Sequence, residues 1–391
     1  MNVLVVNIGS TSFKFRLFDM AQERALATGA VEGVGKPESR VTFQLGDAEP
    51  VVTHQSVADQ AQAVRMCLGQ LASPGGGAAT SIDAVGFKAV HGGDIAGAVR
   101  VTPQVIRTME DFAEAAPAHN PPYLTAMRAF ETQMPGTPLV AAFETGFHQT
   151  IPQARRTYAI PYEWTTKFGV RRYGFHGASH RYVATRTAEL LGRDDLRVIS
   201  CHLGGSSSIC ALRDGKSMST SLGMTPQSGV PQNNRVGDFD AYALFTLRAR
   251  IGMPMDALLT TMASEGGLLG ISGVSNDMQE IIQAAQSGHE RAALALDVFT
   301  ESVRDYIGAY LVALRGLDVL VFTGGIGERS AEVRRRVCDG LEFLGLRLDP
   351  ARNETGGSEA TISADGAGVR ILALATNEEL IVARQTKRVL G

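Results

Sequence analysis

Short apolar and alternating stretches, separated by glycine and polar turns, fill the first 55 residues of the chain. Three of them, VLVVNIG at 3–9, FKFRLFD at 13–19 and RVTFQL at 40–45, are rich in β-branched and aromatic residues and predict strands. Two later stretches, 82–94 and 138–150, each begin as a buried strand and end in polar or glycine residues. The pattern predicts buried strands whose ends carry chemically active side chains.

Helical periodicity marks other segments. Apolar residues recur at helical spacing over 291–316, which predicts one long amphipathic helix. Ser179 is the expected N-cap of another helix. Thr376 and Glu379 have the spacing of a capping box at the start of the last helix. The glycine-rich stretch 73–81 predicts a surface loop.

One hairpin pattern occurs twice. Residues 5–19 (VVNIGSTSFKFRLFD) align without a gap with residues 200–214 (SCHLGGSSSICALRD), about half the chain away. Gly9 falls on Gly204, and hydroxyl residues follow both glycines. Chance similarity between two glycine-serine hairpins is the alternative, but the half-length spacing favours a duplicated supersecondary unit.

Length and composition limit the class of protein. At about 150 residues per domain, 391 residues predict two or three domains. The net charge of −3 provides no basic field for a nucleic acid or an anionic membrane. The four cysteines form no CxxC pair and are expected to be buried, reduced thiols. No apolar run has the ~18 residues of a membrane helix, and no signal peptide is expected. We therefore expect a soluble cytoplasmic protein without a nucleic-acid or membrane partner. The basic cluster 334–336 is interpreted as a solvated helix face.

The two hairpin tips have the composition of phosphate-binding turns. Backbone N–H groups around glycine can converge on an anion, and hydroxyls and a lysine such as Lys14 add further donors. A third glycine loop, GGIGE at 324–328, follows a buried strand and precedes a helix, where phosphate or nucleoside binds in α/β units. The chain has neither a Walker loop nor a Rossmann fingerprint. Each tip alone is a weak signal, because a tight β-turn is its commoner meaning.

Histidines gather beside glycines and at strand ends. His176 and His180 are four residues apart, as in a helical metal pair, but the glutamate of HExxH is missing. The alternative to metal binding is that these histidines donate hydrogen bonds to a group during its transfer. A purely structural role in a loop is expected for His119 or His148.

Charged residues stand at the ends of several predicted strands. Carboxylates and amides such as Asn7 suit Mg²⁺, and an arginine suits the charge on a phosphoryl group in flight. Any one of them could form an ordinary surface ion pair. Together they indicate a two-domain α/β protein that binds a nucleoside polyphosphate in a central cleft and transfers a phosphoryl group to an undetermined acceptor. The residues concerned are Lys88, Glu144, Arg235, Asp238 and Glu378.

The chain resembles the acetate kinase family over essentially its whole length. The matching segments include VNIGSTSFKF, KAVHGGD, HNPP, FETGFHQTIP, RRYGFHGASHRYV, SCHLGGSSS, GLLGISGVSNDM, FTGGIGE and TNEEL. The resemblance implies an α/β fold of two duplicated actin-like ATPase domains, ribonuclease H-like, around a central nucleotide cleft. It implies a first domain of residues 1–150, completed by the C-terminal helix 378–391, and a second domain of residues 151–377.

The resemblance also implies roles for individual residues. His176 and Arg235 would stabilise the in-line transition state and Glu144 would complete the catalytic set. Asn7 and Glu378 would hold Mg²⁺, or Mn²⁺ in its place. The acid would meet Lys88, Val90, Ala118, Phe175 and Pro226. ATP or ADP would meet Ser10, Ser12, Lys14, His202, Leu203, Gly204, Gly205, Ser206, Asp277, Met278, Gln279, Gly325, Ile326, Gly327, Glu328 and Arg329.

Five positions depart from the family pattern. Lys88 replaces an arginine and cannot make its bidentate fork, while Glu144 replaces an aspartate and is one methylene longer. Gly205 removes the side-chain donor of an asparagine, Gln279 replaces an arginine, and Ala118 replaces a leucine. Lys88 and Glu144 still supply one cation and one anion, so we expect an active enzyme whose preference among acid substrates is shifted or weakened.

The resemblance implies ATP-dependent, reversible phosphorylation of acetate or a similar short-chain carboxylate, by a homodimer that pairs through the second domain. Three alternatives stay open: a non-catalytic nucleotide-binding regulator of the same fold, a kinase for a larger or hydroxylated acid such as propionate or butyrate, and a sugar or polyol kinase with Glu144 as base.

Overall fold

The computed structural model describes residues 1–72 and 81–391, so the loop predicted at 73–81 lies almost entirely outside the described residues. Among the helices in these ranges, none is long and apolar enough to cross a lipid bilayer. The described chain forms two compact units, whose boundaries each lie one residue before those expected. Unit 1 is Met1–Gln149 with Asn377–Gly391, and unit 2 is Thr150–Thr376.

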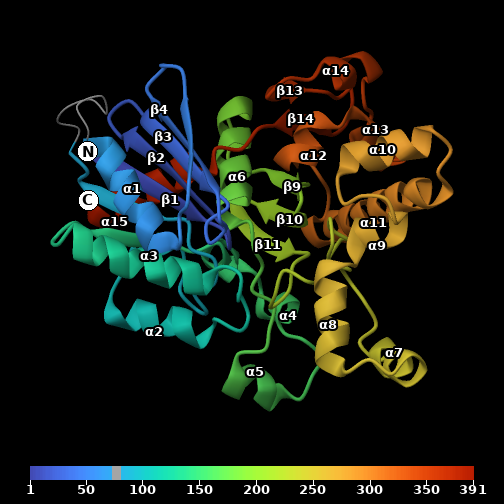
Figure 1. Cartoon of the computed structure of the whole chain (residues 1–391). Coiled ribbons are helices and arrows are strands. Elements are labelled where there is room, and N and C mark those ends of the chain that lie inside the picture. The colour runs from blue at the N-terminus through green and yellow to red at the C-terminus, as the bar shows by residue number, and fades with distance from the viewer. Residues whose placement is uncertain (73–80) are drawn as a thin grey trace. The chain divides into compact units, whose positions relative to one another are not determined.

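Unit 1 is built on a mixed sheet with the strand order β5-β4-β3-β2-β1-β6-β8-β7 over the described residues. Figure 1 labels β1 to β4 of this sheet. Strand β1 is buried on both faces, which explains its continuous apolar run. Leu4 and Val6 belong to the cluster with α1 and α3, whereas Val3 and Val5 pack against α15. The elements are β1 (Asn2–Ile8), β2 (Ser12–Asp19), β3 (Arg24–Glu32), β4 (Ser39–Leu45), β5 (Val51–Gln55), α1 (Gln60–Ala72), β6 (Ala84–Phe87), β7 (Ala98–Arg100), α2 (Pro103–Asp111), α3 (Asn120–Gln133), β8 (Leu139–Ala142), the 3₁₀ segment η2 (Thr145–Thr150), which continues into unit 2, and α15 (Glu378–Leu390).

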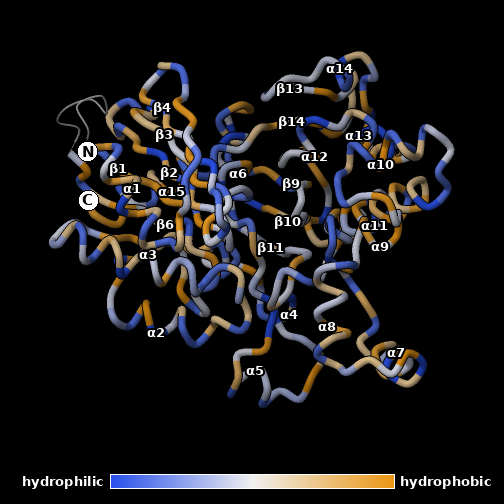
Figure 2. Tube along the Cα trace, viewed as in Figure 1, coloured by the Kyte–Doolittle hydropathy of each residue, from blue (hydrophilic) through white to orange (hydrophobic). Residues whose placement is uncertain are grey.

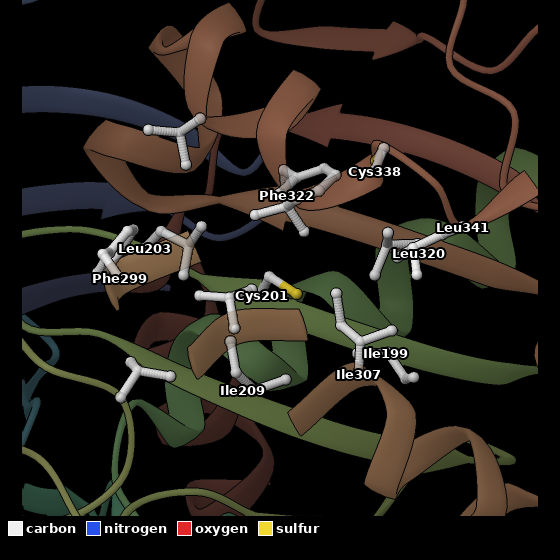
Figure 3. Packing of buried hydrophobic residues seen from close by; sticks show 14 of the residues in the cluster. Ile199, Cys201, Leu203, Ile209, Phe299, Ile307, Leu320, Phe322, Cys338 and Leu341 are labelled. Carbon is white, nitrogen blue, oxygen red and sulfur yellow. The ribbon is translucent and has the colours of Figure 1, made fainter. Parts of the chain in front are cut away.

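Unit 2 contains a second mixed sheet, with the order β11-β10-β9-β12-β14-β13 in the part of the chain that is described. Figure 3 shows its core, where Phe299 and Ile307 of α11 pack with Ile199 and Phe322 of the sheet. Hydrophobic positions follow these strands and α11 in Figure 2. The elements are α4 (Gln153–Arg156), α5 (Tyr162–Phe168), α6 (Gly177–Leu191), β9 (Arg197–His202), β10 (Ser208–Arg213), β11 (Lys216–Thr220), α7 (Ala243–Ile251), α8 (Met255–Ser264), α9 (Gly267–Ser272), α10 (Met278–Gln286), α11 (Glu290–Leu314), β12 (Val319–Thr323), α12 (Gly324–Arg329), α13 (Ala331–Cys338), η3 (Glu342–Leu344), α14 (Pro350–Thr355), β13 (Glu359–Thr361) and β14 (Arg370–Leu374).

The two sheets repeat one topology. β3-β2-β1-β6-β8-β7 of unit 1 corresponds strand for strand to β11-β10-β9-β12-β14-β13 of unit 2, with the same parallel and antiparallel pairings. The gapless alignment of the hairpins is wrong by one residue, however. Asn7 pairs with Lys14 in the first hairpin, whereas His202 pairs with Ser208, not Ile209, in the second. The second tip is therefore one residue shorter, and a slip of one residue moves side chains to the opposite face of the sheet.

Three helix ends differ from the sequence predictions. Helix α6 begins at Gly177, so Ser179 lies inside its first turn and is not the N-cap. Helix α15 is capped by Asn377, whose side chain accepts from the Leu380 N–H, and not by Thr376. Helix α11 ends at Leu314, because Arg315 adopts a left-handed conformation with φ 59°.

The four cysteines are free and buried. Burial raises the pKa of each thiol, to about 12 for Cys210 and Cys338. Thiols that stay protonated at neutral pH are poor nucleophiles, so all four are structural, as predicted.

Candidate active site in two half-sites

In unit 1, three candidate residues lie where parallel strands end. Strands β1, β6 and β8 run parallel, so their carboxyl ends meet at one edge of the sheet. Asn7 is near the end of β1, Lys88 follows β6 directly, and Glu144 comes two residues after β8. The structure thus brings together at this edge residues that are distant in the sequence.

Lys88 is shared by two carboxylates. Its Nζ lies 3.6 Å from Oε1 of Glu144 and also contacts Oε2 of Glu378, in the first turn of α15. These side chains are only 17%, 6% and 15% exposed. Burial alone lowers the pKa of the Lys88 ammonium, but the charges of Glu378 and Glu144 more than offset this, so its pKa is raised. Lys88 is therefore a permanent cation that neutralises two buried anions.

Tyr123 orients the amide of Asn7. Its hydroxyl accepts a hydrogen bond from the Ile8 N–H at 2.8 Å and donates to Oδ1 of Asn7 at 3.5 Å. Burial raises the pKa of Tyr123, although Lys88 opposes this, so the phenol stays protonated as a donor. The sequence pattern does not single out Tyr123, because an aromatic residue inside a helix is normally a core residue.

Gly9 lies in the tight first hairpin tip. The Gly9 N–H bonds to the Ser12 carbonyl at 2.9 Å, and a β-carbon at Gly9 would lie 2.7 Å from Oγ of Ser12. Gln60 holds the Gly9 carbonyl from α1 at 3.2 Å. Ser10 and Lys14 are exposed, and Ser12 is half-buried. The tip is thus a braced turn with accessible donors.

In unit 2, two glycine loops interlock at the ends of β9 and β12. The Leu203 N–H donates to the Thr323 carbonyl at 2.7 Å, and the Leu203 carbonyl accepts from the N–H groups of Ile326 and Gly327 at 2.9 and 3.1 Å. Leu203 is fully buried, so it can offer a ligand only its backbone. In the second tip, Oγ of Ser207 bonds to both the N–H and the carbonyl of Gly204.

Helix α12 is anchored by the buried side chain of Arg334. Arg334 is only 2% exposed, so the interpretation of 334–336 as a solvated face is wrong for its first member. Arg334 donates to the carbonyls of Gly327 and Glu328 and to Asn353. These bonds satisfy carbonyls at the end of a short helix, which otherwise lack partners. Three successive arginines do not reveal which one points inward.

The start of α10 contains three further candidates. Asp277 caps the helix by accepting from the N–H groups of Gln279 and Glu280 at 2.8 and 3.3 Å. Asp277 and Gln279 are exposed, whereas the Met278 side chain is 4% exposed and packs in the core. Only the first and third of these side chains therefore face solvent.

A chain of hydrogen bonds supports His176. Its Nδ1 is 2.8 Å from Oγ of Ser208, the same Oγ is 2.8 Å from Nε2 of His180, and Nδ1 of His180 is 2.9 Å from Oγ of Ser200. His176 also stacks on His202, with ring centroids 4.3 Å apart. Ser208 thus lies between the two histidines and links Nδ1 of His176 to Nε2 of His180.

His176 also has an unusual backbone. Its φ of 57° is left-handed, a conformation in which histidine is enriched among non-glycine residues but which costs energy. It occupies the N-cap position of α6. The ring is thus held in place by Ser208, by His202 and by the backbone together.

Arg235 is fixed to the second phosphate tip. Its Nη1 lies 3.1 Å from both Oγ of Ser206 and Oε1 of Gln232. Gln232 is fully buried, accepts from Oγ of Ser206 at 2.7 Å and donates to the Pro226 carbonyl at 2.8 Å. Burial lowers the pKa of Arg235, but a guanidinium remains charged at neutral pH. The role of Gln232 is not predicted by the sequence, because its only signal is its place in a polar run beside Arg235.

The remaining candidates are divided between the units. Val90 packs partly buried against the unit 1 core, and Ala118 is exposed. In unit 2, Phe175 is buried and Pro226 is half-buried. Asp238 has a structural role, because it accepts from the Gly229 N–H and from the Tyr306 hydroxyl.

The comparisons with known proteins agree with these features. The model of the acetokinase family matches residues 2–384. The chain belongs to the acetokinase family. It is 44% identical to the acetate kinase of Bacillus subtilis over 391 residues, covering 99% of this chain and 98% of that protein.

Solved structures of the same size also match. The structure of Porphyromonas gingivalis acetate kinase superposes with a TM-score of 0.93 at 40% identity and 100% coverage of both chains. A propionate kinase from Francisella tularensis gives 0.93 at 34% identity and 99% coverage of both chains. The expected α/β fold with duplicated actin-like ATPase domains is therefore confirmed.

Proposed function

We propose that the chain is an ATP-dependent kinase that phosphorylates acetate or a similar short-chain carboxylate, reversibly. The observation that carries this proposal is that one loop region, 202–208, holds both His176 and Arg235. His176 stacks on His202 and bonds to Ser208, and Arg235 bonds to Ser206. Nucleotide binding alone does not require both a positioned histidine and a positioned arginine beside a phosphate loop. Stabilisation of charge on a transferring phosphoryl group does.

In the proposed reaction, a carboxylate oxygen of the acid attacks the γ-phosphorus of ATP in line. The bond from the γ-phosphorus to the bridging oxygen breaks, and ADP leaves with that electron pair. Arg235 and His176 donate to the equatorial phosphoryl oxygens. Backbone N–H groups at the tips, with Ser10, Ser12, Lys14 and 202–206, hold the phosphates. The exposed Asp277 and Gln279, the Met278 backbone and the loop 325–329 hold the nucleoside.

Lys88 and Glu144 of unit 1 are the proposed binding residues for the carboxylate of the acid. Lys88 attracts the carboxylate as a point charge, and Glu144, paired with it, orients its ammonium. Val90, Ala118, Phe175 and Pro226 contact the acyl group. The exposed alanine at position 118 leaves more room than a larger apolar residue, which favours tolerance of acids longer than acetate.

Asn7 and Glu378 form a donor set that fits Mg²⁺ or Mn²⁺. Both offer oxygen atoms, and Mg²⁺ in phosphoryl-transfer sites is usually held by one or two protein carboxylates plus phosphate oxygens. Tyr123 bonds to Oδ1 of Asn7 on one side only, and a carbonyl oxygen has a second lone pair. The ion would supply positive charge to the β- and γ-phosphate oxygens.

A direct assay tests the proposed function. The purified chain is incubated with Mg-ATP and a panel of acids (acetate, propionate, butyrate and lactate), and acyl phosphate is trapped with hydroxylamine. We expect turnover with acetate and propionate. Tight Mg-ATP binding without acyl phosphate from any acid would contradict the kinase and favour a nucleotide-binding regulator.

We also propose a homodimer that pairs through unit 2. Four large apolar side chains on and before α7 are 44% to 79% exposed. The ring centroids of Tyr242 and Phe245 are 6.0 Å apart. Such a patch is costly to leave in water and is typical of an interface. The four residues are Phe239, Tyr242, Phe245 and Ile251.

Phe245→Glu is expected to convert the dimer into a monomer, because it places a charge in the middle of the patch. Sedimentation velocity at micromolar concentration measures the change. Phe343→Glu, at an 80% exposed phenylalanine outside the patch, is the control and should leave the mass unchanged. A dimer that survives Phe245→Glu would exclude this surface as the interface.

A further inference from the structure

Gly205, at the exposed end of the second phosphate tip, faces the side chain of one other residue. A β-carbon built on Gly205 would lie 3.2 Å from Nδ2, 3.7 Å from Cγ and 4.0 Å from Oδ1 of Asn233. The backbone of Gly205 is not in the left-handed region, so its conformation does not demand glycine. What the position does require is room for the Asn233 amide.

The backbone of Asn233 is locked against the tip. Its N–H donates to the Gly205 carbonyl at 3.3 Å, and its carbonyl accepts from the Leu269 N–H at 2.9 Å. The preceding residue, Gln232, joins Ser206 to Arg235. The segment 232–235 and the tip therefore form one rigid piece of unit 2.

The Asn233 side chain, by contrast, makes no hydrogen bond with any residue that the structure describes. Its Oδ1 is buried without a partner. A buried acceptor without a partner calls for an explanation, but it cannot bond to a phosphate oxygen, which is also an acceptor. The group that can donate to a phosphate is Nδ2, and it likewise bonds to no described residue. An amide that is held rigidly beside a phosphate loop, and that the protein itself leaves unused, is available to a ligand.

We propose that Asn233 supplies the side-chain amide donor to the nucleotide phosphates that Gly205 cannot supply. The inference rests on the proposed function. The resemblance to the acetate kinase family implies an asparagine where this chain has Gly205. Here the amide comes from the neighbouring segment into the space beside the missing side chain. The Nδ2 group carries two N–H donors, which suit phosphate oxygens.

This arrangement predicts non-additive substitutions, because the two positions share one space. Asn233→Ala removes the donor and is expected to weaken Mg-ATP binding roughly tenfold to a hundredfold, as for a hydrogen bond to a charged group. Gly205→Asn crowds Asn233 and should not strengthen binding. The double variant Gly205→Asn/Asn233→Ala restores one amide without the clash, and should bind within about threefold of the unaltered chain.

Isothermal titration of the full-length variants with Mg-ATP and with adenosine is the test, with circular dichroism to confirm folding. Adenosine lacks phosphates, so its affinity should be unchanged in Asn233→Ala. Asn234→Ala removes a neighbouring amide that bonds to no described residue, and should bind Mg-ATP normally. An equal loss for adenosine, an equal loss in Asn234→Ala, or no rescue in the double variant would overturn the proposal.

The same measurements separate this inference from the proposed function. If the unaltered chain forms acyl phosphate but Asn233→Ala binds Mg-ATP normally, the role of Asn233 fails and the kinase stands. If Asn233→Ala weakens Mg-ATP binding selectively but no acid is phosphorylated, the role of Asn233 stands and the kinase fails.

Discussion

Lys88→Met is expected to destabilise the fold and to remove nearly all kinase activity. The substitution leaves the carboxylates of Glu144 and Glu378, 6% and 15% exposed, without the cation that they share. Breaking a buried ion pair from one side typically costs about 3–5 kcal/mol, because the partner charge stays buried and unpaired. Urea unfolding at pH 7 and the hydroxylamine assay measure the two effects.

The loss of stability in Lys88→Met should increase as pH rises. In the unaltered chain the pKa of Lys88 is raised, so its contribution is complete below the unfolded value of about 10.4 and is lost only as pH rises through the higher folded pKa. In Lys88→Met, the two carboxylates are expected to raise each other's pKa. The folded variant then binds more protons than its unfolded chain, so its stability falls as pH rises. The gap to the unaltered chain should be wider at pH 7.5 than at pH 5.

Lys88→Arg is the matched control. It keeps the positive charge and offers a bidentate fork, so most of the stability should be retained. If Lys88→Met were as stable as the unaltered chain at pH 7.5, the two carboxylates would not depend on this lysine.

His176→Ala is expected to lower kcat roughly 10²–10³-fold with little change in the KM for ATP, because it removes a positioned donor to the phosphoryl group. A modest loss of stability is also expected, because the stack on His202 and the bond to Ser208 are lost and the left-handed φ of 57° disfavours alanine. His176→Asn, which tolerates the left-handed backbone, keeps a donor and should retain more activity. Steady-state kinetics with thermal denaturation measures both variants.

The hydrogen-bond chain behind His176 allows a graded test. Ser208→Ala removes its direct partner, and misorientation of the ring should cost about tenfold to a hundredfold in kcat. Ser200→Ala acts only through His180, so its effect should be smaller. Wild-type kcat in Ser208→Ala, or a larger loss in Ser200→Ala, would show that the chain of bonds does not position His176.

Local features of the site could be predicted because short windows encode them. A glycine followed by hydroxyl residues after an apolar run specifies a turn between strands, and both tips are such turns. The predicted helix around 291–316 was correct to within two residues, because its buried face repeats at helical spacing. The hairpin register was less predictable, since one residue in the tip shifts a whole strand.

By itself the sequence determined the α/β class, the repeated hairpin, the glycine tips and the polar residues that follow strands, since each depends on neighbouring residues. Only the tertiary structure decided which side chains meet. Lys88 joins Glu378 because α15 returns to the first sheet, and Gln232 joins Ser206 to Arg235. Arg334 turns inward, whereas the next arginine, Arg335, is exposed. Only the tertiary structure places the Asn233 amide beside Gly205. Such pairings arise from chain topology and packing, which bring together residues that no local pattern connects.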